Sequence, residues 1–329
     1  MNESSSKFVD QFALEKLLTE KLSKVHHSPH KSFFRKEELP FDGFEDAGFS
    51  LKTGEVVFIN NHSSHQVIRI PSSIITEPYP ENSHIYLHFQ RTANARGNIL
   101  LVHGLYDDNL LNYNFLIELL KAAGFNVFLF IMPYHYERKP AVSLFSGEFY
   151  FSADLFRSQH AAKQAIYDLK TAVGVVKHMV NLPTMIVGYS MGGCISLRYF
   201  MLENDPEVLF LVNPVTRLSE LIWESPLLSP VRNDLEATGY NLEQAQNYFR
   251  AFDPVKNIGS HLVGEKIALG YSIYDQIVDE AKYLRFIEKF QFKNVYPYHA
   301  GHLNVLRVPK LSNDITLFFE TMVKKPVKL

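Results

Sequence analysis

A regular alternation of short apolar runs with helical segments, which begins near residue 96, constrains the fold of this 329-residue chain more than any other feature. The apolar runs have the lengths of buried strands, and they are Ile99–Val102, Val127–Met132, Thr184–Val187, Val208–Val212, Ile267–Leu269 and Phe290–Tyr296. The helical patterns between and after them are Leu110–Ala123, Ala153–Val180, Ile195–Glu203, Asp279–Lys289 and Asn313–Lys324. Continuous apolar strands that alternate with helices are typical of a parallel sheet covered on both faces. The sequence therefore predicts an α/β fold with a mostly parallel central sheet.

The preceding residues, 1–95, show a different pattern. Apolar residues recur at helical spacing over Phe8–Val25, which predicts an amphipathic helix that packs on the body of the protein rather than on a membrane. We expect the next segment, His26–His30, to be a solvated loop, because its histidines lack the nearby carboxylate partners that a metal site would need. Apolar runs bounded by Asn, Pro and Ser predict antiparallel strands, and they are Val56–Ile59, Val67–Ile70 and Ile85–Phe89.

A long stretch after Val208–Val212 interrupts the alternation. It contains prolines and two helix-like pieces, Leu218–Trp223 and Leu242–Phe252. Long insertions in a compact domain usually serve the functional site, so we expect a small helical cap. The predicted organisation is an N-terminal helix and strand extension over residues 1–95, a core over residues 96–213 and 258–329, and a cap over residues 214–257.

Composition narrows the classes of function. Lys and Arg total 33 and Asp and Glu total 35, and this balance lacks the basic surface of a protein that binds nucleic acid. The single cysteine, Cys194, excludes an intrachain disulfide and a multi-cysteine zinc site. The first residues lack the apolar region of a signal peptide, and no run reaches the roughly 18 apolar residues of a membrane span. We therefore expect a cytoplasmic protein without integral membrane association.

The segment Gly188–Gly193, with the sequence Gly-Tyr-Ser-Met-Gly-Gly, carries the strongest local signal. It lies between an apolar run and a helical pattern, so Ser190 is expected at a sharp strand-to-helix turn with its hydroxyl exposed at the end of a strand. Glycines permit the tight backbone of such a turn. The N–H of Met191, at the start of the helix, would then point toward an oxyanion formed on a substrate that Ser190 attacks. An ordinary glycine-rich turn is the alternative.

A nucleophilic serine needs a base and an acid that orients it. Asp275 lies just past a predicted strand, and His302 lies in the loop between the last predicted strand and the last helix. Both come after the serine in the chain, at the ends of strands, where such partners are expected. His299 is an alternative base, and Asp253 and Asp279 are alternative acids, although Asp279 has the position of a helix start.

Four features from residue 96 onward together resemble the α/β-hydrolase superfamily. They are the elbow at Gly188–Gly193, His103-Gly104 after the strand Ile99–Val102, the Tyr-Asp-Gln-Ile-Val turn at Tyr274–Val278, and Gly301-His302 before the last helix. The resemblance implies Ser190 as nucleophile, Asp275 as acid and His302 as base, with no metal or organic cofactor. Some members carry the acid after the strand that follows the elbow, but this chain has Asn213 there. Residues Pro133–Pro140 further resemble an uncharacterised branch of the superfamily.

The resemblance also implies an oxyanion hole. Its second donor would be the N–H of Leu105, in the loop after the strand Ile99–Val102, where Gly104 lets the backbone approach closely. We expect His103 to be a buried histidine that orients this loop rather than a base. Together with the N–H of Met191, this loop would bind the oxygen of a tetrahedral intermediate.

Three residues are candidates for contact with the substrate. Arg138 follows the strand Val127–Met132 on the same sheet edge as Ser190, so it could pair with an anionic group of a substrate or else form a salt bridge that fixes its own loop. Tyr189 lies beside the nucleophile. Trp223, in the cap, could line an acyl pocket or pack the cap itself.

The function that these features predict is hydrolysis of a carboxylic ester on a small molecule, through an acyl-enzyme on Ser190. A thioesterase or a serine peptidase would use the same residues. A non-catalytic binding protein on the same fold is the alternative from a different class.

Overall fold

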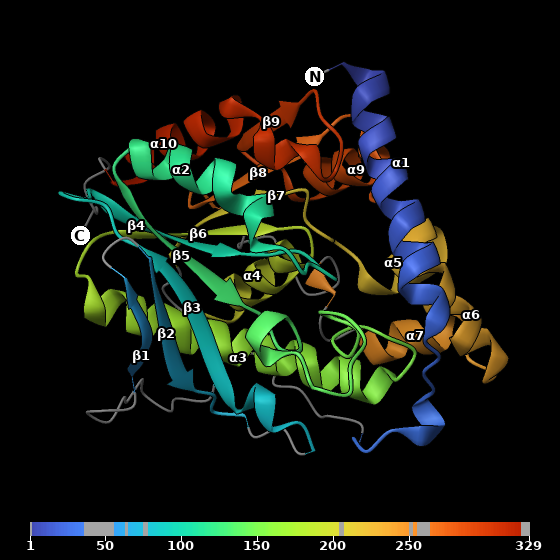
Figure 1. Cartoon of the computed structure of the whole chain (residues 1–329). Helices are drawn as coiled ribbons and strands as arrows, with labels where there is room; N and C mark the ends of the chain where they lie inside the picture. The colour runs from blue at the N-terminus through green and yellow to red at the C-terminus, as the bar shows by residue number, and fades with distance from the viewer. Residues whose placement is uncertain are drawn as a thin grey trace.

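The computed structural model describes residues 2–35, 56–62, 65–74, 78–203, 207–249, 253–254 and 264–323. In this part of the chain, one sheet has the strand order β1-β2-β3-β5-β4-β6-β7-β8-β9 (Figure 1). The strands are Val57–His62 (β1), His65–Pro71 (β2), His84–Gln90 (β3), Gly97–Val102 (β4), Phe125–Ile131 (β5), Thr184–Tyr189 (β6), Val208–Val212 (β7), Ile267–Ser272 (β8) and Asn294–Tyr298 (β9). Strands β4 to β9 are parallel to their neighbours among themselves, whereas β1, β2 and β3 pair antiparallel. The predicted α/β fold is confirmed.

Helices cover both faces of this sheet. Their bounds are Glu3–Glu20 (α1), Asn114–Ala122 (α2), Leu155–Met179 (α3), Met191–Leu202 (α4), Leu218–Glu224 (α5), Ser229–Ala237 (α6), Leu242–Phe249 (α7), Glu280–Phe290 (α9) and Pro309–Val323 (α10). Side chains of α2 and α10 form one hydrophobic core with one face of the sheet, and those of α3, α4 and α9 form the other. Successive residues of β6 point alternately into these cores, with Met185 and Val187 on one side and Ile186 on the other.

The last strand differs from its prediction. The apolar run that predicted a strand over Phe290–Tyr296 begins with the end of α9, and β9 starts only at Asn294. Phe290 is spaced four residues from Phe286, and both rings are buried and in contact, so they complete the apolar face of the helix. An apolar run by itself does not distinguish a strand from the last turn of a helix.

The region that we predicted as a cap contains α5, α6 and α7, which lie between β7 and β8 in the chain. Helix α5 contacts α6 and α7, and α7 also contacts α3. Buried residues of these helices, among them Ile222, Leu235 and Phe249, join the core on the α3 side of the sheet. Residues 250–252 and 255–257 of the predicted cap lie outside the described residues.

Helix α1 packs on the body of the protein, as predicted, and the apolar residues Leu14, Leu17 and Leu18 of its second half contact the hydrophobic core, whereas its first half buries polar side chains. It begins at Glu3 rather than at Phe8, and the Asn2 side chain caps it by accepting from the N–H of Ser5. The buried side chains in its first half belong to Ser6 and Asp10, whereas Phe8 is 65% exposed. Figure 1 shows α1 along one edge of the sheet, and it contacts both the cap and the segment Asn304–Arg307. Polar residues therefore face the body of the protein in the first half of α1.

The segment His26–His30 has exposed His26 and His30 side chains, as expected of a solvated loop, but two of its histidines also contact other parts of the protein. His26 Nδ1 lies 2.8 Å from a carboxylate oxygen of Asp234 on α6, and the N–H of His27 donates to the same carboxylate. His27 Nε2 also lies 3.2 Å from Glu148. The histidines thus connect the chain after α1 to the cap. Within the described residues, no group of His, Cys, Asp and Glu side chains is arranged to hold a metal.

No helix in the described part of the chain combines the length and the apolar character that crossing a membrane requires.

Candidate active site

Ser190 lies between β6 and α4 in a strained backbone conformation, with φ 53° and ψ −118°. A positive φ is uncommon for serine and persists only where surrounding contacts impose it. Its N–H donates to the carbonyl of Val212, and its own carbonyl accepts from the N–H of Val215. The glycine at Gly192 is required, because a Cβ there would lie 2.3 Å from the carbonyl oxygen of Val102. The predicted strand–turn–helix context of Ser190 is therefore present.

The structure brings the serine, the histidine and the aspartate of the prediction together. His302 Nε2 lies 2.9 Å from Ser190 Oγ, and His302 Nδ1 lies 2.6 Å from Asp275 Oδ2. Asp275 follows β8 and His302 follows β9, so adjacent parallel strands deliver both side chains to one edge of the sheet. All three side chains are buried, and Ser190 is 8% exposed.

The alternative partners are used elsewhere. His299 lies 3.1 Å from the hydroxyl of Tyr274, and the structure gives it no contact with the serine. Asp279 caps α9 by accepting from the N–H of Ala281, and Asp253 accepts from the N–H of Leu218. Of the candidate acids and bases, only His302 contacts the hydroxyl of Ser190, and only Asp275 contacts the His302 ring.

The Asp275 carboxylate is held as a hydrogen-bond acceptor. Oδ1 accepts from the N–H groups of Ile277 and Val278, each at 2.8 Å, and Oδ2 accepts from the hydroxyl of Tyr283 at 3.0 Å. Because the Asp275 carboxylate beside Nδ1 accepts hydrogen bonds, the neutral ring of His302 carries its proton on Nδ1. Nε2 is then free to accept the hydroxyl proton of Ser190, which is the arrangement that a general base needs.

The charges around His302 favour its protonated form. Burial of the ring alone would lower its pKa, but the Asp275 carboxylate and, further away, the Asp10 carboxylate outweigh that effect and raise the pKa above its ordinary value. A raised pKa makes His302 a stronger base in its neutral form. The pKa of His302 also sets the lowest pH at which most of the protein has a neutral His302 ring.

The loop after β4 is held beside Ser190. A Cβ at Gly104 would lie 3.5 Å from the Cβ of Ser190. His103 fixes this loop, as predicted: its Nε2 accepts from the N–H of Met132 at 3.0 Å, and its Nδ1–H donates to the carbonyl of Gly104 at 2.8 Å. Burial lowers the pKa of His103, in keeping with a neutral ring. Among the described residues, neither the N–H of Leu105 nor that of Met191 has a protein acceptor.

Tyr189 contacts His302 through both its hydroxyl and its ring. Its buried hydroxyl donates to the carbonyl of His302 at 3.0 Å, and the two rings lie 5.4 Å apart. Asn213, at the position where some relatives carry the acid, donates to the same carbonyl at 3.2 Å. The hydroxyl of Tyr189 therefore holds the loop of His302, and the substrate contact predicted for Tyr189 stays a prediction.

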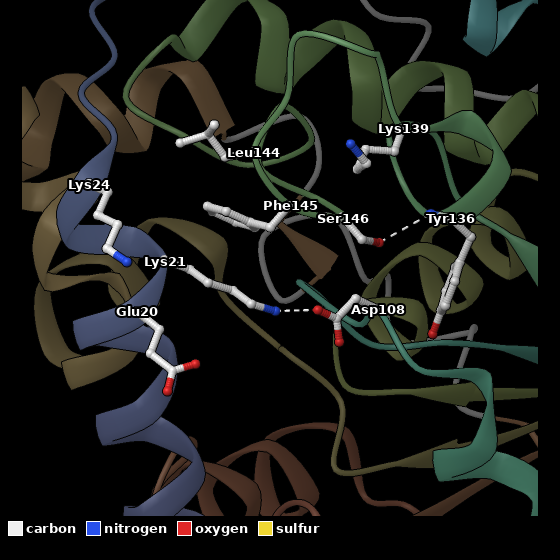
Figure 2. A pocket seen from close by; sticks show the side chains of 9 residues that line it. All are labelled: Glu20, Lys21, Lys24, Asp108, Tyr136, Lys139, Leu144, Phe145 and Ser146. Atoms are coloured by element: carbon white, nitrogen blue, oxygen red, sulfur yellow. Dashed lines mark hydrogen bonds and ion pairs between the residues drawn. The ribbon is translucent and has the colours of Figure 1, made fainter.

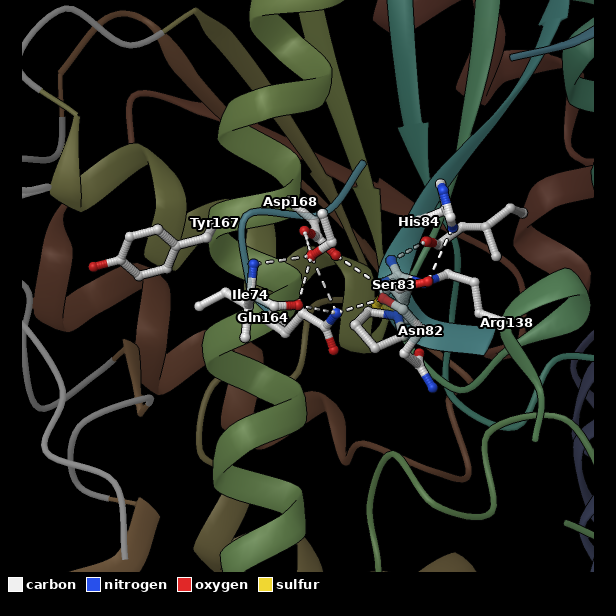
Figure 3. A network of polar contacts seen from close by, with 12 residues as sticks. Ile74, Asn82, Ser83, His84, Arg138, Gln164, Tyr167 and Asp168 are labelled. Atoms are coloured by element: carbon white, nitrogen blue, oxygen red, sulfur yellow. Dashed lines mark hydrogen bonds and ion pairs between the residues drawn. The ribbon is translucent and has the colours of Figure 1, made fainter. Parts of the chain in front are cut away.

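Arg138 is placed differently from the substrate contact that we predicted. Its side chain is fully buried, and Nη2 lies 2.7 Å from Asp168 Oδ2 on α3 (Figure 3). The guanidinium further donates to the carbonyls of Ile131 and Asn82. The salt bridge that we gave as the alternative is the one found, and it ties the segment after β5 to α3. A substrate would not reach this guanidinium.

A cavity of about 500 Å³ lies between the end of α1 and the loops after β4 and β5 (Figure 2). Lys21, Lys24 and Lys139 line it together with Glu20 and Asp108, and Lys21 pairs with Asp108. Ser190 and His302 are not among its lining residues. Trp223 does not line it either: the indole is half-buried against the core, as in the alternative that it packs the cap.

One residue of the site escaped the sequence analysis. Asp10, on α1, accepts from the N–H of His302 at 2.6 Å. The signal in the sequence is weak, because an aspartate four residues from Ser6 on a helix is usually a solvated residue. Asp10 reaches His302 because α1 contacts the loop after β9 in the folded protein.

Residues 97–218 match the family model for the alpha/beta hydrolase fold. Among solved structures, acetyl xylan esterase from Paenibacillus sp. R4 is 14% identical, with 81% of this chain and 87% of that chain covered and a TM-score of 0.57. A thermostable carboxyl esterase from Bacillus coagulans is 14% identical, with 80% and 100% covered and a TM-score of 0.52. An esterase from Pyrococcus furiosus is 15% identical, with 78% and 92% covered and a TM-score of 0.52. No curated protein matches the chain.

The matched residues 97–218 include β4 to β7 and the sharp turn at Ser190. The chain has the α/β-hydrolase fold, and its resemblance to the α/β-hydrolase superfamily is confirmed. At these identities the likeness to the solved structures concerns the fold.

Proposed function

We propose that this protein is a serine hydrolase that cleaves a carboxylic ester through an acyl-enzyme on Ser190. The observation that carries the proposal is the continuous hydrogen-bonded series from Ser190 Oγ through the two ring nitrogens of His302 to Asp275. Each member is buried, and the acid has its remaining acceptor sites filled. A chance meeting of these three groups would not require the strained backbone found at Ser190.

The proposed reaction has two stages, acylation of Ser190 and release of the acyl group by water. His302 Nε2 removes the proton of Ser190 as Oγ bonds to the ester carbonyl carbon, and the carbonyl oxygen becomes an oxyanion. The N–H groups of Met191 and Leu105 would bind that oxyanion, a contribution of about 3–4 kcal/mol for one such donor. Protonated His302 gives its proton to the departing alcohol. Water, deprotonated by the same histidine, then attacks the acyl carbon. The bond from that carbon to Ser190 Oγ breaks, the protonated histidine returns its proton to Oγ, and the carboxylic acid and the free serine are released.

Ester cleavage is favoured over the alternatives because the three proteins of similar fold described above are esterases. The same residues also serve thioesterases and serine peptidases. Parallel assays with short-chain p-nitrophenyl esters, acyl thioesters and peptides separate these substrate classes, and we expect the esters to react fastest.

The nucleophile is tested by covalent labelling with a fluorophosphonate, which reacts with activated serines. We expect the full-length protein to be labelled and Ser190→Ala to be unlabelled. Ser196→Ala is the matched control, because Ser196 lies buried on α4 and its hydroxyl has no partner among the described residues. Equal labelling of the original protein and Ser190→Ala would overturn the proposal, as would the failure of the original protein to be labelled.

A further inference from the structure

The carboxylate of Asp10 connects the two loops that carry the proposed base and acid. Oδ2 accepts from the N–H of His302 at 2.6 Å and from the N–H of Gln276 at 3.3 Å, and Oδ1 accepts from the N–H of Leu303 at 3.0 Å. Gln276 directly follows Asp275. One side chain from the other end of the sequence therefore fixes the main chain beside both partners of the serine.

The contact is close because the sequence leaves room for it. A Cβ at Gly301 would lie 2.6 Å from Asp10 Oδ2 and 2.8 Å from the carbonyl oxygen of Ser6. Asn304 donates to the hydroxyl of Ser6 and accepts from the N–H of Gly301. The glycine that precedes the histidine thus allows α1 to approach the loop. The polar buried face of α1 is explained by the same contact.

Asp10 also brings a negative charge to this part of the site. Its side chain is fully buried, and the hydrogen bonds to its carboxylate all come from N–H donors, so both oxygens act as acceptors. Such bonds favour the ionised form, although burial raises the pKa of Asp10. A carboxylate at this place favours a positive charge on the imidazole of His302.

We propose that Asp10 is a positioning residue of this site: it holds the backbone of His302 and Leu303 in place and, as a second carboxylate after Asp275, stabilises the imidazolium that forms during the reaction. The proposal rests on the function proposed above for Ser190 and His302. It makes helix α1 a part of the active site rather than an appendage of the fold. Asp10 does not contact the reacting atoms and acts through His302.

A pH profile distinguishes this role from a merely structural one. The polar and charged groups that face His302 are Asp275, Asp10, the hydroxyls of Tyr189 and Ser190, and the amide of Asn213. Because the Asp10 carboxylate raises the pKa of His302, its removal lowers that pKa. The acid limb of the pH profile is the range in which the rate rises with pH as His302 loses its proton. It then moves to lower pH, because His302 becomes neutral at a lower pH. A purely structural loss of activity would leave the limb in place.

The experiment compares full-length Asp10→Asn with the original protein. The rates measured are fluorophosphonate labelling and hydrolysis of p-nitrophenyl acetate between pH 5 and 9. We expect both rates at neutral pH to fall about tenfold to a hundredfold, because an amide places a donor against N–H groups and the base shifts. We expect the acid limb to move to lower pH. Glu15→Gln is the matched control, because it removes a carboxylate from the exposed side of the same helix.

Asp10→Ala, which removes the carboxylate without adding a donor, provides a second variant, and circular dichroism checks that each variant is folded. A reduced rate with a shifted acid limb in either folded variant supports the proposal. An unchanged rate overturns it, and so does a reduced rate with an unmoved limb. Absence of labelling in the original protein would instead overturn the proposed function, and this proposal with it.

Discussion

The carboxyl edge of the sheet and helix α1 contribute to the same site in different ways. At the sheet edge, Ser190, Asp275 and His302 each follow a strand, so the register of parallel strands places the groups that we propose to react. Helix α1 supplies Asp10, which touches only the main chain beside those groups. The comparison separates the residues that we propose to carry out the chemistry from the residue that we propose to hold them in place, and the two kinds should respond differently to substitution.

Asp275→Asn should produce the largest loss. The amide cannot hold His302 with its proton on Nδ1, so Nε2 no longer accepts the proton of Ser190, and kcat/KM should fall about 10,000-fold. Because the Asp275 carboxylate raises the pKa of His302, the acid limb of the residual activity should also move to lower pH. Ester hydrolysis measured between pH 5 and 9 checks both effects.

Asp279→Asn is the control for that change. It makes the same chemical substitution four residues later, at the cap of α9, where asparagine serves about as well as aspartate. Its kcat/KM should stay within about twofold of the original. Similar losses of kcat/KM in the two variants would mean that the loop as a whole, and not the Asp275 carboxylate, is responsible. Asp275 would then not belong to the groups that we propose to react.

The sheet edge could be predicted because its signals are local. Each predicted partner follows an apolar run, and parallel strands end at a common edge. The elbow around Ser190 needs glycines at fixed positions, and Gly192 is one whose Cβ would collide with the backbone of Val102. Such a pattern is visible in a few consecutive residues. The same reasoning located His103 as the histidine that orients the neighbouring loop.

The contribution of α1 could not be predicted, because Asp10 and His302 are 292 positions apart and nothing near Asp10 specifies its partner. The sequence left two directions open for the side chain of Arg138 for a related reason. Tyr134 and Tyr136 both have positive φ, 62° and 48°, and these turns belong to a segment in which Arg138 points toward Asp168. A side chain that follows a strand reaches the ligand edge only if the loop leads it there.

Arg138→Ala sharpens the comparison by testing a residue near the edge that we place outside the site. The substitution leaves the buried Asp168 without its cation, so the free energy of unfolding should fall by about 3–5 kcal/mol. The KM of the folded variant should stay unchanged, since no substrate reaches the guanidinium. Urea unfolding and ester kinetics below the transition measure the two quantities.

Two further variants control for this change. Lys139→Ala removes the neighbouring cation, whose contact is a carbonyl of Ser143, and should cost less than about 1 kcal/mol. Arg138→Met combined with Asp168→Leu should recover much of the stability, because an apolar pair can replace a buried ion pair. A raised KM with unchanged stability would restore Arg138 as a substrate contact.

Gly301→Ala tests the boundary between the two regions, with the smallest expected effect. The added methyl group would meet Asp10 Oδ2 at 2.6 Å and the carbonyl of Ser6 at 2.8 Å, so α1 must move away from the loop of His302. We expect kcat/KM to fall about tenfold, because a small displacement of the base is costly. In an Asp10→Ala background the carboxylate is already gone, so the same methyl group should cost less, and the two changes should couple by about 0.5–3 kcal/mol. Strictly additive losses would show that α1 and the loop act on the reaction independently, and Asp10 would then be a neighbour of the site rather than a part of it.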